Sequence, residues 1–173
     1  MFDSDDSDLD PGLILTAAEE TTRSLNLLEA RKLELACAWA HAHTVTSTGR
    51  VLSGTDQLIH LGGDGTPAIA EFAPAEFGAA CGESPYRARL LVGDALDLHH
   101  RHPVLWRRVL DGEVKAWVAC SIVRTTRHHR VEIAAEVDRL IAPYADRKAP
   151  GELVRIVEGH LIRLDPRWRQ GSG

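Results

Sequence analysis

The sequence predicts a single all-α domain, and three observations support that fold class. No segment alternates apolar and polar residues over any length, whereas apolar residues recur three and four positions apart along most of the chain. Prolines and glycines fall at the ends of these apolar repeats, where helices begin and end. Hydrophobic residues make up 44% of the 173 residues, which is enough for one buried core.

The first predicted helix is the longest and runs from about Leu13 to Thr46. Its apolar residues follow a heptad spacing of four and three, interrupted by the polar residues Thr21 and Lys32. A helix of this length spans about 50 Å, so we expect it to pack along several other helices or along a second copy of the chain. In the second case the chain is a homodimer, and the candidate self-association residues are Ile14, Ala18, Leu25, Leu28, Leu35 and Trp39.

The chain divides into three predicted parts. Residues 1–11 are expected to be a disordered acidic tail, because five aspartates, two serines and a proline offer nothing to bury. Residues 12–166 form the helical domain, and residues 167–173 form a flexible C-terminal tail. No apolar run reaches the roughly 18 residues that a membrane span needs, and the acidic start is unlike a signal peptide. We therefore expect a cytoplasmic protein with no membrane partner.

The stretch "LGGDGTPAIAEF" (61–72) raises the question of a phosphate-binding loop. No lysine follows its glycines, and an all-α chain has no strand–loop–helix unit to present them. Glycine and aspartate are ordinary turn residues, so the stretch is interpreted as a turn. We expect Asp64 or Thr66 to cap a helix that begins near Ala68, and "QLIHL" (57–61) to be a short extended piece.

The segment from Pro74 to Leu98 predicts two helices joined by a tight turn. Gly82 ends the first helix, and Ser84 caps the second with Pro85 at its first position. This is the outline of a helix-turn-helix, whose second helix directs its N-terminal residues at DNA bases. The candidate DNA-binding residues there are Ser84, Tyr86, Arg87 and Arg89. Further helices are expected within residues 103–113, 114–129, 131–146 and 149–166.

The charge distribution permits an anionic partner. The chain carries a net charge of −5, yet residues 85–130 hold nine basic and four acidic side chains. Arg101, Arg124 and Arg127 in this stretch are the predicted phosphate contacts. The alternative for this stretch is a simple solvated arginine-rich face. Two observations also count against DNA contact by the helix-turn-helix: Asp94 and Asp97 lie on its second predicted helix, and two helices joined by glycine are common in α-proteins.

The sequence predicts no metal ligand, cofactor or catalytic residue. The histidine-rich "HAH", "HHRH" and "RHH" segments, which include His99, His100 and His102, have no cysteine or carboxylate at a zinc-like interval. The "HHRH" and "RHH" segments fall at predicted helix ends, where histidine favours the helix dipole. The three cysteines lie far apart and are expected to be reduced thiols. Trp39, Trp106 and Trp117 are expected in the core.

Several phrases of the sequence together resemble one family. From "LGGDGTPAIAEFAPAEFGAACGESPYRARLLVGDALDLHHRHP" through "VLWRRVLDGEVKAWVACSIVRTTRH", the chain is similar to the DUF222 family of actinobacteria, also called the 13E12-repeat family. The earlier "LLEARKLELACAWAHAH" and the later "VDRLIAPYADRKAPGELVRIVEGHLIRLDP" resemble it too, so the likeness covers roughly residues 14–166. In many members this domain precedes an HNH nuclease domain, so the resemblance implies work on nucleic acid.

The nuclease activity of such relatives does not carry over to this chain. HNH chemistry needs histidine, asparagine or aspartate residues around a metal, and the only asparagine here is Asn26 in the first predicted helix. We therefore expect no enzyme but a DNA-associated or regulatory helical module. The alternatives are an oligomerisation or protein-interaction module, with any HNH nuclease as a separate chain, and a truncated nuclease remnant without activity.

Overall fold

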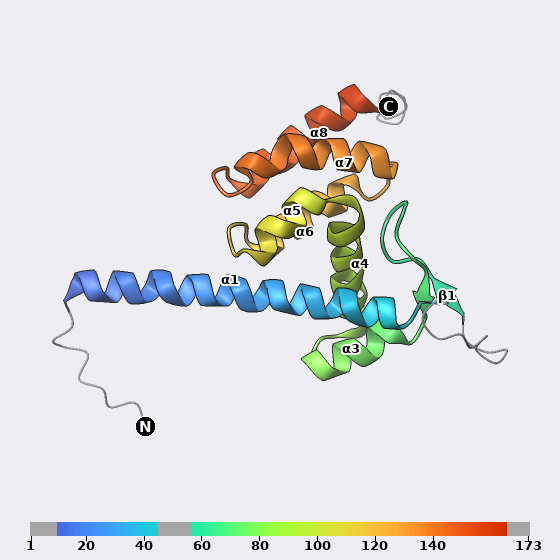
Figure 1. The fold of residues 1–173 in the computed structure, drawn as a ribbon, viewed down its shortest axis with the longest axis horizontal. Helices are drawn as coiled ribbons and strands as arrows, with labels where there is room; N and C mark the ends of the chain where they lie inside the picture. Colours follow the sequence, from blue (N-terminus) through green and yellow to red (C-terminus); the bar gives the residue numbers. More distant parts are fainter. Residues whose placement is uncertain (1–9, 45–56, 166–173) are drawn as a thin grey trace.

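The computed structural model describes residues 10–44 and 57–165 of the chain. Over these ranges the chain forms α-helices and one two-stranded sheet, which confirms the all-α class (Figure 1). The helices are α1 (Pro11–Ala42), α3 (Ala73–Cys81), α4 (Pro85–Arg101), α5 (Pro103–Leu110), α6 (Ala116–Thr126), α7 (Val131–Ile141) and α8 (Pro150–Leu164). A 3-10 turn (Ala142–Tyr144) follows α7. Residues 1–9 of the predicted acidic tail and all of the predicted tail 167–173 lie outside the described residues.

Helix α4 lies at the centre of the fold. It packs against α1, α3, α5, α6 and α7, and it runs across α1, with α3 on one side of α1 and α5 to α8 on the other (Figure 1). Every residue of α4 from Val92 to Leu98 is buried, including Asp94 and Asp97. The exposed residues of α4 are therefore confined to its two ends.

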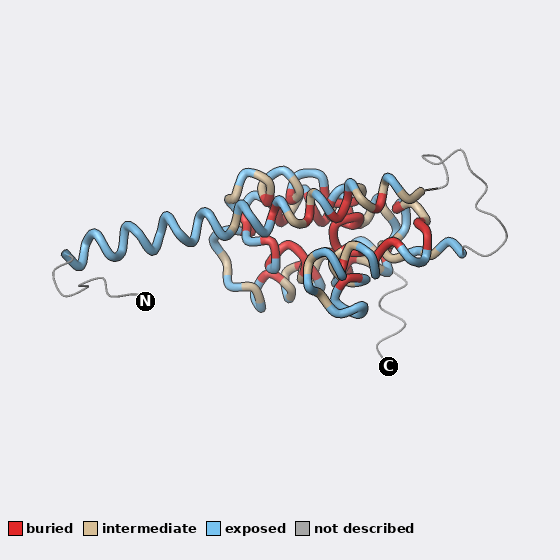
Figure 2. The backbone as a smooth tube through the Cα atoms, turned by 90° about the horizontal axis from the view of Figure 1, so that it is seen from below, coloured by how far each residue is buried: buried red, intermediate tan, exposed pale blue. Residues whose placement is uncertain are grey.

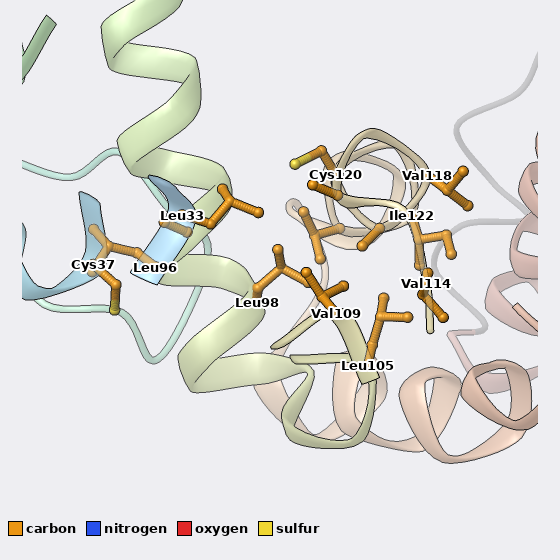
Figure 3. Close-up of a cluster of buried hydrophobic side chains, with 14 of the residues drawn as sticks. Leu33, Cys37, Leu96, Leu98, Leu105, Val109, Val114, Val118, Cys120 and Ile122 are labelled. Carbon is orange, nitrogen blue, oxygen red and sulfur yellow. The ribbon is translucent and has the colours of Figure 1, made fainter. Parts of the chain in front are cut away.

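The C-terminal half of α1 belongs to the core. Its buried residues Ala30, Leu33, Cys37 and Ala40 recur three or four positions apart, as the apolar face of an amphipathic helix does. They share one cluster with residues of α4, α5 and α6 (Figure 3). The members drawn there include Leu96, Leu98, Leu105, Val109, Cys120 and Ile122.

The N-terminal half of α1 extends away from the body of the fold. All 15 residues from Pro11 to Leu25 are exposed, and the helix projects alone in Figure 2. The helix begins at Pro11, because proline suits the first helical position, and it ends at Ala42 rather than at the predicted Thr46. The expectation that α1 packs along other helices of the chain therefore holds only for its second half.

The predicted extended piece before the glycine-rich stretch is confirmed. It forms β1 (Leu58–Ile59), which pairs antiparallel with β2 (Ile69–Ala70). The strand β2 occupies the position where a helix was expected to begin near Ala68, so that expectation is wrong. The helix α3 begins only at Ala73, because residues 69–70 complete the sheet.

The glycine-rich stretch is a turn, as expected, but it caps a different helix from the one predicted. The Asp64 carboxylate accepts a hydrogen bond from the backbone N–H of Val131 at the start of α7 (3.0 Å). The Thr66 hydroxyl donates to the carbonyl of Gly63 (2.7 Å), so it closes the turn itself. The Gly63 N–H donates to the carboxylate of Asp97 (2.7 Å). These bonds attach the turn to α4 and α7 instead of to α3.

Candidate functional site

The predicted helix-turn-helix outline is present as α3, a short turn and α4. Gly82 ends α3 in the left-handed conformation with φ +67°, as glycine permits. Ser84 caps α4 by accepting a hydrogen bond from the N–H of Arg87 (3.3 Å). The four residues predicted to face DNA here are all exposed, namely Ser84, Tyr86, Arg87 and Arg89. They cover only the N-terminal end of α4, because the helix is buried from Val92 onward.

The exposed end of α4 borders a groove of about 440 Å³. The floor and walls come from α1, the first half of α4, and α6, and we call this site the α1–α4–α6 groove. Its lining includes Glu29, Lys32, Leu33, Glu83, Tyr86, Arg87, Leu90, Leu91, Asp94, Ala116, Trp117, Cys120 and Arg124. The groove therefore unites three of the predicted DNA-binding residues, Tyr86, Arg87 and Arg124.

Two aromatic side chains stand exposed at this groove. Tyr86 is 71% exposed and Trp117 is 53% exposed. The expectation that Trp117 fills the core is wrong, because its neighbours Ala116 and Val118 occupy the buried face of α6. An exposed tyrosine and an exposed tryptophan at one groove form an apolar surface with a polar edge, which suits contact with flat or apolar groups.

A carboxylate at the groove holds two cations. Glu83 lies 2.6 Å from the Lys32 ammonium of α1 and 2.9 Å from the Arg87 guanidinium of α4. The hydrogen bonds from Lys32 and then Arg87 lower the pKa of Glu83. The charge of Arg87 is thus partly neutralised within the chain, although the side chain remains exposed.

Two buried aspartates of α4 bind the arginines of α6 and its C-terminal end. Asp94 accepts from Arg124 (Nε to Oδ1, 3.0 Å) and from Arg127 (Nη2 to Oδ1, 2.7 Å). Asp97 accepts from Arg127 (Nε to Oδ2, 2.6 Å). The hydrogen bond to Asp94 is the main cause that raises the pKa of Arg124. These arginines therefore compensate buried carboxylates, since such charges are costly unless paired.

Arg101 cannot contact phosphate in this structure, which corrects the prediction. Its side chain has no exposed surface and lies 3.2 Å from the Asp97 carboxylate. Its guanidinium also donates to the carbonyl oxygens that end α6, those of Thr126 (3.0 Å) and Arg127 (3.2 Å), and to that of His129 (2.5 Å). The last carbonyls of a helix have no partner within it, so Arg101 satisfies the end of α6.

Arg124 and Arg127, the other two predicted phosphate contacts, are partly exposed, but each is already paired with a carboxylate. The Arg124 side chain is 47% exposed and that of Arg127 is 18% exposed, and both are bound to Asp94. Three of the nine basic side chains of residues 85–130, those of Arg101, Arg124 and Arg127, therefore pair with the buried carboxylates of α4. Arg87 and Arg89 are both exposed near the N-terminal end of α4.

The predicted self-association seam is mostly solvent-exposed. Leu28 is 66% exposed, Leu25 56%, Ile14 49% and Leu35 44%, and Ala18 is exposed as well. Trp39 differs from the others and is half-buried, because its indole N–H donates to the carbonyl of Ala73 (2.8 Å). Trp39 therefore packs within the chain, while the rest of the seam faces solvent.

A cluster that sequence analysis did not assemble lies where the end of α4 meets α1. Cys37 and His41, one turn apart on α1, lie beside His99 and His100 of α4, and we call these four the Cys–His cluster. The Cys37 Sγ is 3.9 Å from His41 Nδ1, and His41 Nε2 is 2.8 Å from His100 Nε2. The i, i+4 spacing of Cys37 and His41 was the available signal, since it places both on one helical face.

Burial perturbs the acid–base properties of this cluster. It raises the pKa of the Cys37 thiol to about 11. It also lowers the pKa of His99 and of His100, with smaller contributions from the neighbouring imidazoles. These shifts favour the neutral forms of Cys37, His99 and His100.

Comparison with protein-family models, with curated proteins and with solved structures yields no match. Among the described residues, none of the helices combines the length and the apolar character needed to cross a membrane.

Proposed function

We propose that the chain is an association module in which the exposed seam of α1 pairs with α1 of a second copy. The single observation that carries this proposal is the projecting half of α1, whose apolar side chains have no cover from the described part of the chain. Large apolar side chains grouped on one exposed face are typical of an interaction surface. The heptad spacing of the seam is that of helices that pair along their length.

The angular position of the seam around α1 supports pairing with a second copy of the chain. At 3.6 residues per turn, the seam lies about a third of a turn around α1 from the face that contains Leu33 and Cys37. The body of the fold covers that second face and leaves the seam accessible, so both can be occupied at once. Lys32 interrupts the seam, but its ammonium is bound by Glu83 (2.6 Å) and turned toward the groove. The pairing surface is therefore the part before Lys32, in which Leu28 and Leu25 are the most exposed of the large apolar seam residues.

The expected effect of Leu28→Glu follows from the exposed fraction of Leu28. Full burial of a leucine contributes about 1.5–3 kcal/mol, and Leu28 is 66% exposed. Its burial in a pair contributes about 1–2 kcal/mol per copy, or about 2–4 kcal/mol in a symmetric dimer. Leu28→Glu removes this contribution and adds a desolvated charge. We expect the dimer to weaken by at least about 30-fold.

Analytical ultracentrifugation over a micromolar concentration series tests the proposal. The wild-type chain should shift from monomer to dimer with concentration, and Leu28→Glu should remain monomeric. Ile162→Glu is the matched control, because Ile162 is an exposed apolar residue (42%) on α8; this variant should dimerise like the wild type. A wild-type monomer throughout the series would contradict the proposal. Equal weakening by both variants would contradict the assignment to α1.

DNA is a second candidate partner, and the α1–α4–α6 groove favours it. Exposed aromatic rings beside Arg87 and Arg124 combine stacking surface with positive charge, a pairing that single-stranded nucleic acid sites use. The resemblance to the DUF222 family points the same way. The internal pairing of Arg124 and Arg127 predicts weak binding, carried mainly by Arg87 and Arg89. An HNH nuclease on a separate chain stays a prediction.

Fluorescence anisotropy with pools of single-stranded and duplex DNA at two salt concentrations tests this candidate. Binding should weaken with salt, and removal of one arginine–phosphate interaction should lower the logarithmic salt slope by about 0.9 for duplex. The double variant Arg87→Ala/Arg89→Ala should bind less, whereas Arg155→Ala, an exposed position on α8, should not. No binding at low salt by folded protein would remove DNA as a partner.

A further inference from the structure

The Cys–His cluster has the composition of a transition-metal site. A thiol and imidazoles are the ligands that Zn²⁺ prefers in proteins. One donor atom from each of Cys37, His41 and His99 lies within 4.8 Å of the other two. Two separate helices supply them, α1 and the last turn of α4, so the fold brings together residues about 60 positions apart.

We propose that Cys37, His41 and His99 bind a divalent transition-metal ion of the zinc class. Zinc bonds of about 2.0–2.3 Å in tetrahedral geometry place neighbouring ligand atoms about 3.3–3.6 Å apart. The Cys37 Sγ and His41 Nδ1 are already 3.9 Å apart. Contraction of the donor separations by up to about 1.5 Å therefore brings the three donors to zinc distances. On binding, the Cys37 thiol releases its proton to solvent and coordinates as a thiolate.

His100 is the positioning residue of this site. His41 uses Nδ1 toward Cys37, and its Nε2 lies 2.8 Å from Nε2 of His100. A histidine ligand ordinarily donates its second N–H to a fixed acceptor, which selects the tautomer and orients the ring. With His100 as that acceptor, His41 presents the lone pair of Nδ1 to the metal.

The exposure of the ligands provides an entry path. Cys37 is buried, His41 is half-buried and His99 is exposed, so an ion enters past His99. Three protein ligands leave one tetrahedral position on the solvent side for water or for an exogenous ligand. The metal links α1 to α4 and thereby steadies the helix that carries the seam. The site does not depend on whether α1 pairs with a second copy.

Cobalt titration of the full, tag-free chain under a phosphine reductant tests the proposal. Co²⁺ should bind at one equivalent per chain, with a thiolate-to-cobalt charge-transfer band and strong visible bands of tetrahedral cobalt. Zn²⁺ should displace it. His100→Gln should weaken binding about 10- to 100-fold, and His99→Gln, which removes a ligand at an exposed position, should weaken it more. Cys37→Ser should abolish the charge-transfer band.

Two matched variants serve as controls. Cys81→Ser at the end of α3 and His128→Gln after α6 make the same chemical changes outside the cluster and should bind cobalt like the wild type. Circular dichroism of each metal-free variant separates removal of a ligand from unfolding, and His99→Gln keeps the test decisive if Cys37→Ser unfolds. Absence of the charge-transfer band in the wild type would overturn the proposal. Undiminished binding by His99→Gln would do the same.

Discussion

Replacement of Gly63 by alanine tests how the glycine-rich turn is held. Gly63 lies against the buried guanidinium of Arg101, and a Cβ added there would approach both that group and the carbonyl of Arg127 far within 3.0 Å, a separation that real Cβ atoms essentially never cross. The carbonyl belongs to the backbone at the end of α6, so it cannot swing aside as a flexible side chain does. The turn must move instead.

Gly63→Ala should lower the free energy of unfolding for two reasons. Overpacking of a tight interior costs about 1–3 kcal/mol. Movement of the turn also weakens the hydrogen bond from Gly63 to the Asp97 carboxylate, 2.7 Å long, and a bond to a charged group contributes about 1.5–3 kcal/mol. We expect Gly63→Ala to lower the free energy of unfolding by about 3 kcal/mol. For a chain of this size, the midpoint of thermal unfolding should fall by about 6–12 °C.

Gly159→Ala is the matched control, because the same methyl group enters open space. Apart from the adjoining residues and backbone of α8, no heavy atom lies within 4 Å of a Cβ at Gly159. Alanine is favoured over glycine in a helix by about 1 kcal/mol, so this variant should unfold at a higher temperature than the wild type. Thermal and urea unfolding followed by circular dichroism measure both variants. A Gly63→Ala variant within about 0.5 kcal/mol of the wild type would refute the packing argument.

Two buried groups predict opposite responses of stability to pH. Burial lowers the pKa of His102 to about 4. The contribution of neutral His102 to the free energy of unfolding is therefore complete above pH 6.5. It is lost as pH falls toward 4, by up to about 3 kcal/mol. His102→Gln should therefore flatten the rise in stability between pH 4 and 6.5 in urea titrations, and an unchanged slope would contradict this. Burial raises the pKa of Asp138 to about 6. Its contribution to the free energy of unfolding therefore declines as pH rises from 4 to 6. Asp138→Asn should make the rise steeper, and a shallower rise in the same titrations would count against the assignment.

Local signals allowed much of the fold to be predicted from the sequence. Gly82 and Gly112 both take positive φ where helices end, and Ser84 caps α4. Each of these features depends on one residue and its immediate neighbours in the chain. The strength of such signals lies in backbone preferences that need no tertiary contact.

Long-range contacts account for the features that were missed. Asp64 caps a helix that begins 67 positions later, and nothing near Asp64 in the sequence indicates that partner. Arg101 stands in a histidine-rich segment and looks like any surface cation, yet it is fully buried. The Cys–His cluster likewise exists only after α1 and α4 cross.

The projecting half of α1 sets the distance between Pro11 and the body of the fold. Its 15 residues from Pro11 to Leu25 form a rod of about 22 Å. A flexible segment of the same length has a root-mean-square span of about 19–23 Å, which is nearly the same, but its ends also meet and separate freely. The helix therefore adds almost no distance between Pro11 and the helical body. It removes the variation in that distance, so a group attached at Pro11 is kept away from the α1–α4–α6 groove.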